Sequence, residues 1–117
     1  MSRDVPEGSK KLTYKGYIFH IFLKVYEPSD DTFLIADCLE VKEGARVLDL
    51  GTGCGILGIL AAERAERIIG IDINPHAVRC AKANAKTNGI EGKMDLVRGD
   101  LFQPLKSDEK FDLILFN

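Results

Sequence analysis

Short apolar runs alternate with longer amphipathic stretches along most of this 117-residue chain. The runs have the length of β-strands and lie at residues 46–50, 67–74, 93–98 and 111–117. Between them, residues 56–67 and 75–88 carry apolar side chains at the spacing of an amphipathic helix. Strands that are apolar on both faces are typical of a parallel sheet, so the pattern predicts an α/β fold in which crossover helices join parallel strands.

The first third of the chain follows a different pattern. Residues 1–11 are mostly polar, and we expect a flexible tail there. Residues 12–26 are rich in β-branched and aromatic side chains around a Lys15-Gly16 turn, which predicts a hairpin that serves as a lid or an appended flap. Ser29 then stands at the N-cap position of a predicted helix, because two acidic residues and an apolar stretch follow it.

Three alternating glycines, Gly51, Gly53 and Gly55, directly follow the first core strand. Glycine has no Cβ, so such a loop lets the backbone approach a small ligand closely, while the next helix directs free N–H groups toward it. A dinucleotide fingerprint would need its third glycine at the position of Ile56, and a P-loop would need a Gly-Lys-Ser/Thr ending. Instead, Asp49 precedes the first glycine by two residues, where a carboxylate would repel a pyrophosphate but attract a cationic ligand.

Two further acidic residues follow later strands. Asp72 ends the second core strand, and a carboxylate at that point can accept hydrogen bonds from both ribose hydroxyls of an adenosine moiety. Asp100 follows the third core strand. Ligands of open α/β sheets bind at the carboxyl ends of the strands, so this ordered set predicts an adenosine-type ligand.

Composition narrows the classes of function. The net charge is −2, which gives no positive field for holding a phosphate backbone. No segment is apolar enough to span a membrane and the N-terminus has no signal-peptide core, so we expect a cytoplasmic protein. The three cysteines have no paired spacing and no nearby histidine, which predicts buried or half-buried thiols and no metal site.

The Asp-x-Gly-x-Gly-x-Gly motif of residues 49–55 resembles motif I of the class I S-adenosylmethionine-dependent methyltransferases. The string Tyr-Glu-Pro-Ser-Asp-Asp-Thr-Phe-Leu at residues 26–34 resembles the segment ahead of motif I in HemK-like methyltransferases of the archaeal and eukaryotic branch. Those enzymes continue from the position of Asn117 as Asn-Pro-Pro-Tyr. The resemblance implies a Rossmann-like class I methyltransferase fold, with 12–117 as a partial domain whose cofactor-binding half is 27–117.

The resemblance also implies roles for individual residues. S-adenosyl-L-methionine would lie over the glycine loop, with Asp72 on the ribose, Asp100 on the adenine amino group and the backbone N–H of Leu101 at a ring nitrogen. Asn117 would be the catalytic side chain, accepting a hydrogen bond from an N–H group of the substrate. The expected cofactor-binding residues are Thr32, Asp49, Gly51, Thr52, Gly53, Gly55, Asp72, Ile73, Asp100 and Leu101.

The function implied by the resemblance is N-methylation of a glutamine side chain in a peptide-chain release factor, with a small zinc-binding subunit as activator. The alternatives are adenine-N6 methylation of DNA or RNA, and a non-catalytic adenosylmethionine-binding fragment of a split enzyme. A nicotinamide-dependent dehydrogenase is disfavoured by Ile56. Because the family continues beyond residue 117, we expect this chain alone to be inactive, and its strand 111–116 to form an exposed edge that favours self-association.

Overall fold

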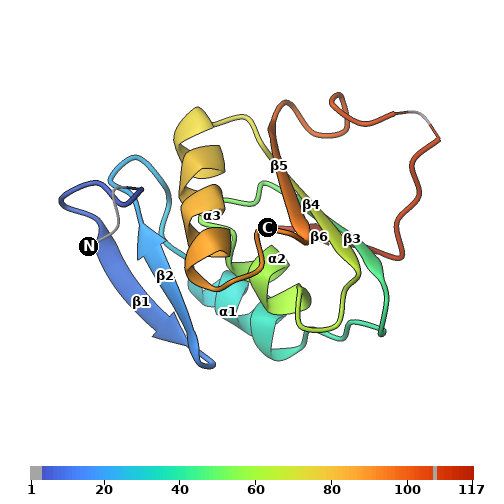
Figure 1. The fold of residues 1–117 in the computed structure, drawn as a ribbon, viewed down its shortest axis with the longest axis horizontal. Coiled ribbons are helices and arrows are strands. Elements are labelled where there is room, and N and C mark those ends of the chain that lie inside the picture. Colours follow the sequence, from blue (N-terminus) through green and yellow to red (C-terminus); the bar gives the residue numbers. More distant parts are fainter. Residues whose placement is uncertain (1–3, 107) are drawn as a thin grey trace.

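A computed structural model describes residues 4–106 and 108–117 (Figure 1). Its centre is a four-stranded sheet in the order β5-β4-β3-β6, and every neighbouring pair is parallel. The strands are β3 (Arg46–Leu50), β4 (Arg67–Asp72), β5 (Met94–Arg98) and β6 (Leu113–Phe116). The predicted α/β fold with parallel strands is therefore confirmed.

The three helices of the described residues lie on the same side of this sheet (Figure 1). They are α1 (Asp30–Asp37), α2 (Ile56–Ala61) and α3 (Pro75–Thr87). The larger buried cluster lies between the helices and the sheet, whereas Leu48 and Leu50 point to the opposite face. There they pack against Leu105 and Phe111 of the connection between β5 and β6, so a loop covers this face.

The strand order reverses beside β3. The chain adds β4 and then β5 on one side of β3, and then returns to place β6 on the other side. Such a reversal opens a crevice at the carboxyl ends of the two strands that flank it, and α/β proteins bind ligands there. Gly51 follows β3 and Asn117 follows β6, and a Cβ built on Gly51 would lie 3.4 Å from the backbone oxygen of Asn117. The fold thus brings two predicted site residues together.

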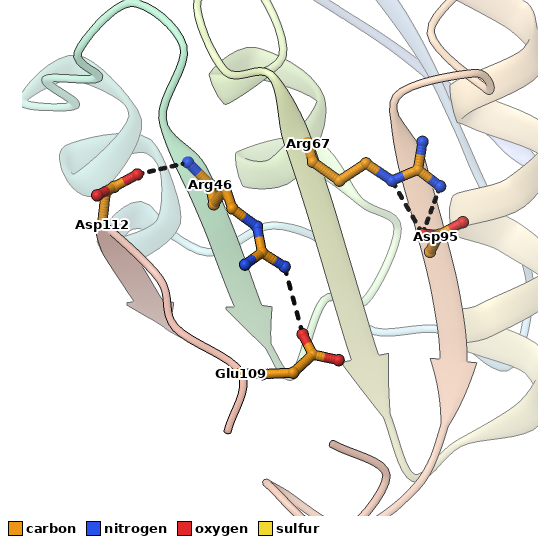
Figure 2. A network of polar contacts seen from close by, with 5 residues as sticks. All are labelled: Arg46, Arg67, Asp95, Glu109 and Asp112. Atoms are coloured by element: carbon orange, nitrogen blue, oxygen red, sulfur yellow. Dashed lines mark hydrogen bonds and ion pairs between the residues drawn. The ribbon is translucent and has the colours of Figure 1, made fainter. Parts of the chain in front are cut away.

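Charged side chains fix the opposite, amino-terminal edge of the sheet (Figure 2). The backbone N–H of Arg46 donates to the Asp112 carboxylate at 2.8 Å, and its guanidinium lies 3.5 Å from Glu109. Arg67 donates to Asp95 through both Nε, at 3.0 Å, and Nη2, at 2.5 Å. These partly exposed pairs contribute little energy each, but they join neighbouring strands and support their register.

The predicted hairpin is present, as β1 (Lys10–Tyr14) paired antiparallel with β2 (Tyr17–Ile21). Its turn residues Lys15 and Gly16 both have positive φ, at 50° and 84°, as a two-residue hairpin turn requires. The second strand ends at Ile21 and not near Tyr26 as predicted. The hairpin is packed on the rest of the fold, because Phe19 is fully buried and β2 contacts α3.

The N-terminal boundaries also differ from the prediction. Residues 1–3 of the expected flexible tail lie outside the described residues, and β1 already begins at Lys10. Val5 is buried, with 6% of its surface exposed, so apolar packing extends into this segment. Of the described residues, none belongs to a helix long and apolar enough to cross a membrane.

Helix α2 is shorter than its sequence pattern, since it ends at Ala61 and not near Arg67. The chain turns back early because its backbone pairs with the segment ahead of β3. Gly44 N–H donates to the Arg64 carbonyl at 2.8 Å, and Glu66 N–H donates to the Ala45 carbonyl at 2.8 Å. These bonds align the first residue of β4 with the first residue of β3, so that Arg46 and Arg67 are register partners.

Candidate functional site

The glycine loop between β3 and α2 has the backbone that its sequence predicts. Gly51, Gly53 and Gly55 have φ angles of 67°, 58° and 88°, a region that side chains with a Cβ disfavour. The backbone N–H groups of Gly51 and Thr52 both donate to the Ile71 carbonyl of β4, at 2.8 and 3.1 Å. The loop is therefore fixed to the neighbouring strand before any ligand binds.

Asp49 supports this loop from inside. Only 1% of its surface is exposed, and its Oδ2 accepts hydrogen bonds from the Thr52 hydroxyl at 2.8 Å and from Gly58 N–H at 3.2 Å. Burial raises the pKa of Asp49 to about 6, although these two hydrogen bonds act to lower it. Asp49 and Thr52 therefore use their side chains to hold the loop, and the attraction of Asp49 to a cationic ligand stays a prediction.

The alternation of residues along β3 explains the inward position of Asp49. Successive side chains of a strand point to opposite faces, so Asp49 points to the same face as Val47 and away from Leu48 and Leu50. That face is covered by α2, where Gly58 leaves room: a Cβ there would lie 3.1 Å from the Asp49 carboxylate.

Asp72, at the end of β4, lies at the carboxyl-terminal edge of the sheet, where ligands of α/β proteins bind. Its Oδ2 accepts the N–H of Gly53 at 2.9 Å and its Oδ1 accepts the N–H of Asn74 at 3.0 Å. A carboxylate has about four lone-pair positions, so about two remain for a ligand on this half-exposed side chain. Two free positions are the number that the two ribose hydroxyls of the predicted ligand would need.

Exposed apolar side chains flank Asp72 on the following segments. Ile73 is 64% exposed, and Leu101 and Phe102, after β5, are 50% and 54% exposed. Asp100 is exposed on the same loop, which is tied to β4 by a 3.0 Å bond from Gly99 N–H to the Asp72 carbonyl. These side chains could hold a planar apolar ring.

Sequence reasoning missed Phe102, although an aromatic residue next to the predicted ligand residues Asp100 and Leu101 was a usable signal. Leu101 itself has a φ of 49°, which is uncommon for a residue with a branched side chain. Such conformations are often found in segments that contact ligands.

Thr32 and Asn117 are brought together from opposite ends of the chain. The Asn117 amide nitrogen Nδ2 donates to the Thr32 hydroxyl at 2.9 Å, and its Oδ1 lies 3.2 Å from the same hydroxyl. Thr32 is 2% exposed in the first turn of α1, which begins at the predicted N-cap Ser29. The pair lies beside Gly51, so the glycine loop, α1 and the end of β6 meet at one place.

A cavity of about 830 Å³ lies elsewhere, between α3, β5 and residues 22–24. It shares no residue with the glycine loop or with the acidic residues at the strand ends. We therefore place the candidate site at the strand ends, where fixed polar groups converge.

A family model described as the methyltransferase small domain matches residues 27–117. This chain belongs to the methyltransferase small domain family. The match includes the glycine loop, Asp72, Asp100, Thr32 and Asn117.

Three relatives of this methyltransferase chain carry different names. A protein of Methanocaldococcus jannaschii provisionally named a protein N5-glutamine methyltransferase is 41% identical over 104 residues, which are 88% of this chain and 51% of the relative. The release factor glutamine methyltransferase of Clostridium acetobutylicum is 29% identical over 116 residues, 93% of this chain and 41% of the relative. The ribosomal protein L11 methyltransferase of Pelotomaculum thermopropionicum is 41% identical over 78 residues, 66% of this chain and 25% of the relative.

The chain thus spans between a quarter and about half of the length of these relatives. Among solved structures, Trm5 of Methanocaldococcus jannaschii in complex with adenosine is similar, with a TM-score of 0.79 and 28% sequence identity. The similarity covers 91% of this chain and 32% of that one. The fold is that of the class I methyltransferases, and the resemblance to HemK-like members is confirmed.

Proposed function

We propose that this chain forms the S-adenosylmethionine-binding part of a methyltransferase that modifies a side-chain amide nitrogen of a protein. The observation that carries the proposal is the meeting of three elements at the strand reversal: the glycine loop after β3, Asp72 after β4 and Asn117 after β6. The first two suit an adenosine-type cofactor, and the third supplies an amide oxygen beside it.

The residues present fit this cofactor. Asp72 has lone pairs left for ribose hydroxyls, and Ile73, Leu101 and Phe102 expose apolar surface for an adenine ring. Asp100 would accept from the adenine amino group. The glycine loop, which Asp49 holds from below, would take the amino-acid part against its backbone, because its three glycines present no Cβ there.

S-adenosylmethionine, when bound, supplies a methyl group on a cationic sulfur. An amide nitrogen is a poor nucleophile, since its lone pair is delocalised into the carbonyl group. The Asn117 side-chain oxygen would accept a hydrogen bond from one N–H group of the substrate amide. This hydrogen bond would turn the lone pair of the substrate nitrogen toward the reacting centre and stabilise the charge that develops on that nitrogen.

For the substrate we propose the glutamine of a peptide-chain release factor. Two relatives named as glutamine methyltransferases support this choice, as does the string at residues 26–34. A small zinc-binding activator subunit belongs to the same proposal. Ribosomal protein L11 is the competing protein substrate, because an L11 methyltransferase is 41% identical over 78 residues.

Cofactor binding is tested by calorimetry with S-adenosylmethionine, its demethylated product and NAD. We expect binding of the first two only, and a loss of about 1.5–3 kcal/mol in Asp72→Ala, which is the range for hydrogen bonds to a charged group. Asp95→Ala is the matched control, because it removes the same charge and breaks an ion pair at the opposite edge of the sheet. Unchanged affinity in Asp72→Ala would refute the assignment of the ribose site.

The substrate is tested with the full-length protein and radiolabelled cofactor. Methyl transfer to a release factor, to ribosomal protein L11, to DNA and to RNA should be measured side by side, with and without a zinc-binding activator. We expect label on the release factor, and none on a variant of it in which the substrate glutamine is replaced. Label on L11 or on nucleic acid alone would overturn the choice of substrate.

A further inference from the structure

We infer that the cavity between α3, β5 and residues 22–24 binds an acidic segment of the protein substrate that also carries apolar side chains. This α3 cavity has a volume of about 830 Å³ and shares no residue with the glycine loop or the acidic strand ends. The inference rests on the proposed function, because a protein substrate is large enough to reach the reaction site and the α3 cavity at the same time.

The floor of the α3 cavity is apolar. Phe22 and Met94 are buried in its wall, and Leu96 of β5 is partly buried beside them. Leu23 lines the same cavity and has 77% of its surface exposed. Exposed apolar surface within a cavity favours a partner that brings apolar side chains of its own.

One end of the α3 cavity is cationic. Lys24, Arg79 and Lys82 line this end, and neither lysine forms an ion pair with any described residue. Arg79 Nη2 donates to His76 Nδ1 at 2.7 Å, so the imidazole accepts at this nitrogen and keeps its Nε2–H as a further donor. Partial desolvation lowers the pKa of His76, and the positive charges of Arg79 and Lys24 lower it further. An acidic group would therefore meet several donors there.

The other end of the α3 cavity is already neutralised. Lys86 forms an ion pair with Asp4 at 3.1 Å. The hydrogen bond to Asp4 raises the pKa of Lys86, and the charges of Asp4 and Glu91 raise it further. The excess of positive charge is therefore confined to one end, in a chain whose net charge is −2. Charge complementarity selects an acidic group for that end, and the apolar floor selects apolar side chains next to it.

The cationic end lies next to the candidate cofactor site. Asn74 Nδ2 donates to the Lys24 carbonyl at 2.9 Å, and the backbone N–H of Asn74 donates to Asp72 at 3.0 Å. From there the α3 cavity extends along α3, since His76 and Lys86 both line it and the helix between them is about 15 Å long. A protein segment can follow this length while its neighbouring residues reach the strand ends, whereas a small anion cannot.

The test uses the full-length protein and reverses two charges of the cationic end. Arg79→Glu/Lys82→Glu changes exposed side chains of α3 and leaves the core in place. Lys42→Glu/Arg64→Glu is the matched control, because it makes the same change in charge at exposed positions before β3 and before β4. Each protein is assayed with the release factor and with a short peptide that contains the substrate glutamine.

We expect Arg79→Glu/Lys82→Glu to raise KM for the release factor about tenfold, because attraction becomes repulsion at two positions. Its kcat and its dissociation constant for S-adenosylmethionine should stay within about twofold of the wild type. With the short peptide, kcat/KM should be unchanged, because the peptide does not reach the α3 cavity. Added salt should raise the wild-type KM for the release factor and have little effect on that of the variant. Leu23→Ser should raise this KM about threefold, through the loss of an apolar contact.

An unchanged KM for the release factor in Arg79→Glu/Lys82→Glu, or an equal increase in the control, would overturn the inference. An equal loss of activity with the short peptide would overturn it too, because the substitutions would then act on the reaction site. If the variant binds the zinc-binding subunit more weakly and keeps its KM for the release factor, the α3 cavity belongs to that subunit and not to the substrate. A wild type that labels neither the release factor nor the peptide would instead refute the proposed function, and the inference with it.

Discussion

Replacement of Asn84 by alanine should destabilise the fold by about 3–4 kcal/mol, even though this side chain touches no predicted ligand. Asn84 lies in α3 and is fully buried. Its Nδ2 donates to the Cys54 carbonyl at 2.8 Å and to the His20 carbonyl at 2.9 Å, and its Oδ1 accepts His20 N–H at 2.7 Å. One side chain therefore joins the hairpin, the glycine loop and α3.

The magnitude follows from the groups that alanine would leave without a partner. A buried polar group that loses its hydrogen bond costs about 1–3 kcal/mol, so the buried Cys54 carbonyl is the most expensive of the three. The two backbone groups of His20 are only partly buried, and water can replace part of their loss. The better helix propensity of alanine recovers a few tenths of a kcal/mol.

Asn88 provides a matched control one helical turn later. It bonds to Ile18, two positions before His20 on β2, in the same way: its Oδ1 accepts Ile18 N–H at 3.1 Å, and its Nδ2 donates to the Ile18 carbonyl at 2.8 Å. Its Nδ2 also donates to the Asn84 carbonyl at 2.8 Å. Asn88 is only partly buried, so Asn88→Ala should cost about 1 kcal/mol. The difference between the two variants therefore reports the burial of Asn84 together with its bond to the Cys54 carbonyl.

Urea unfolding followed by circular dichroism measures both variants, and tyrosine fluorescence provides a second probe, since the chain has three tyrosines and no tryptophan. The slope of the unfolding free energy against urea should be unchanged. Equal losses in Asn84→Ala and Asn88→Ala, or a loss below about 1 kcal/mol in Asn84→Ala, would refute the reasoning.

Two further predictions concern the loops of the candidate site. Burial raises the pKa of Asp49 to about 6, so the ionised carboxylate disfavours the folded state. The stabilising contribution of the protonated carboxyl group is complete below the ordinary pKa of 3.8 and is lost as the pH rises through about 6. The free energy of unfolding, measured with urea at about pH 4.5 and about pH 7.5, should therefore drop by about 2 kcal/mol less in Asp49→Asn than in the wild type, and an equal drop would contradict the raised pKa of Asp49. Gly99→Ala would place a Cβ 2.1 Å from Pro104 Cγ and must displace the loop that carries Asp100, so cofactor binding should weaken about tenfold. Gly92→Ala, whose Cβ would meet nothing within 4 Å, should bind the cofactor as the wild type does.

Local pattern predicted the regular elements well. The N-caps of α1 and α3 at Ser29 and Asn74, the core strands and the glycine loop all depend on neighbours within a few residues. The end of α2 was wrong, because pairing between backbone groups near Gly44 and Arg64 stops a helix whose side-chain pattern would continue. The extent of β2 was also wrong: residues 22–26 are apolar except for Lys24, yet the chain turns there, with Val25 N–H bonded to the Phe22 carbonyl.

By itself, the sequence determined the order of strands and helices, the backbone of the glycine loop and the acidic residues at the strand ends, because hydrophobic period and glycine content act locally. The tertiary structure decided what each polar side chain faces. Asp49 turns inward because the pleat of β3 directs it toward α2, and Asn84 is buried because the hairpin packs on α3. Thr32 meets Asn117 across 85 positions only because the strand order reverses beside β3, a long-range choice that no local pattern encodes.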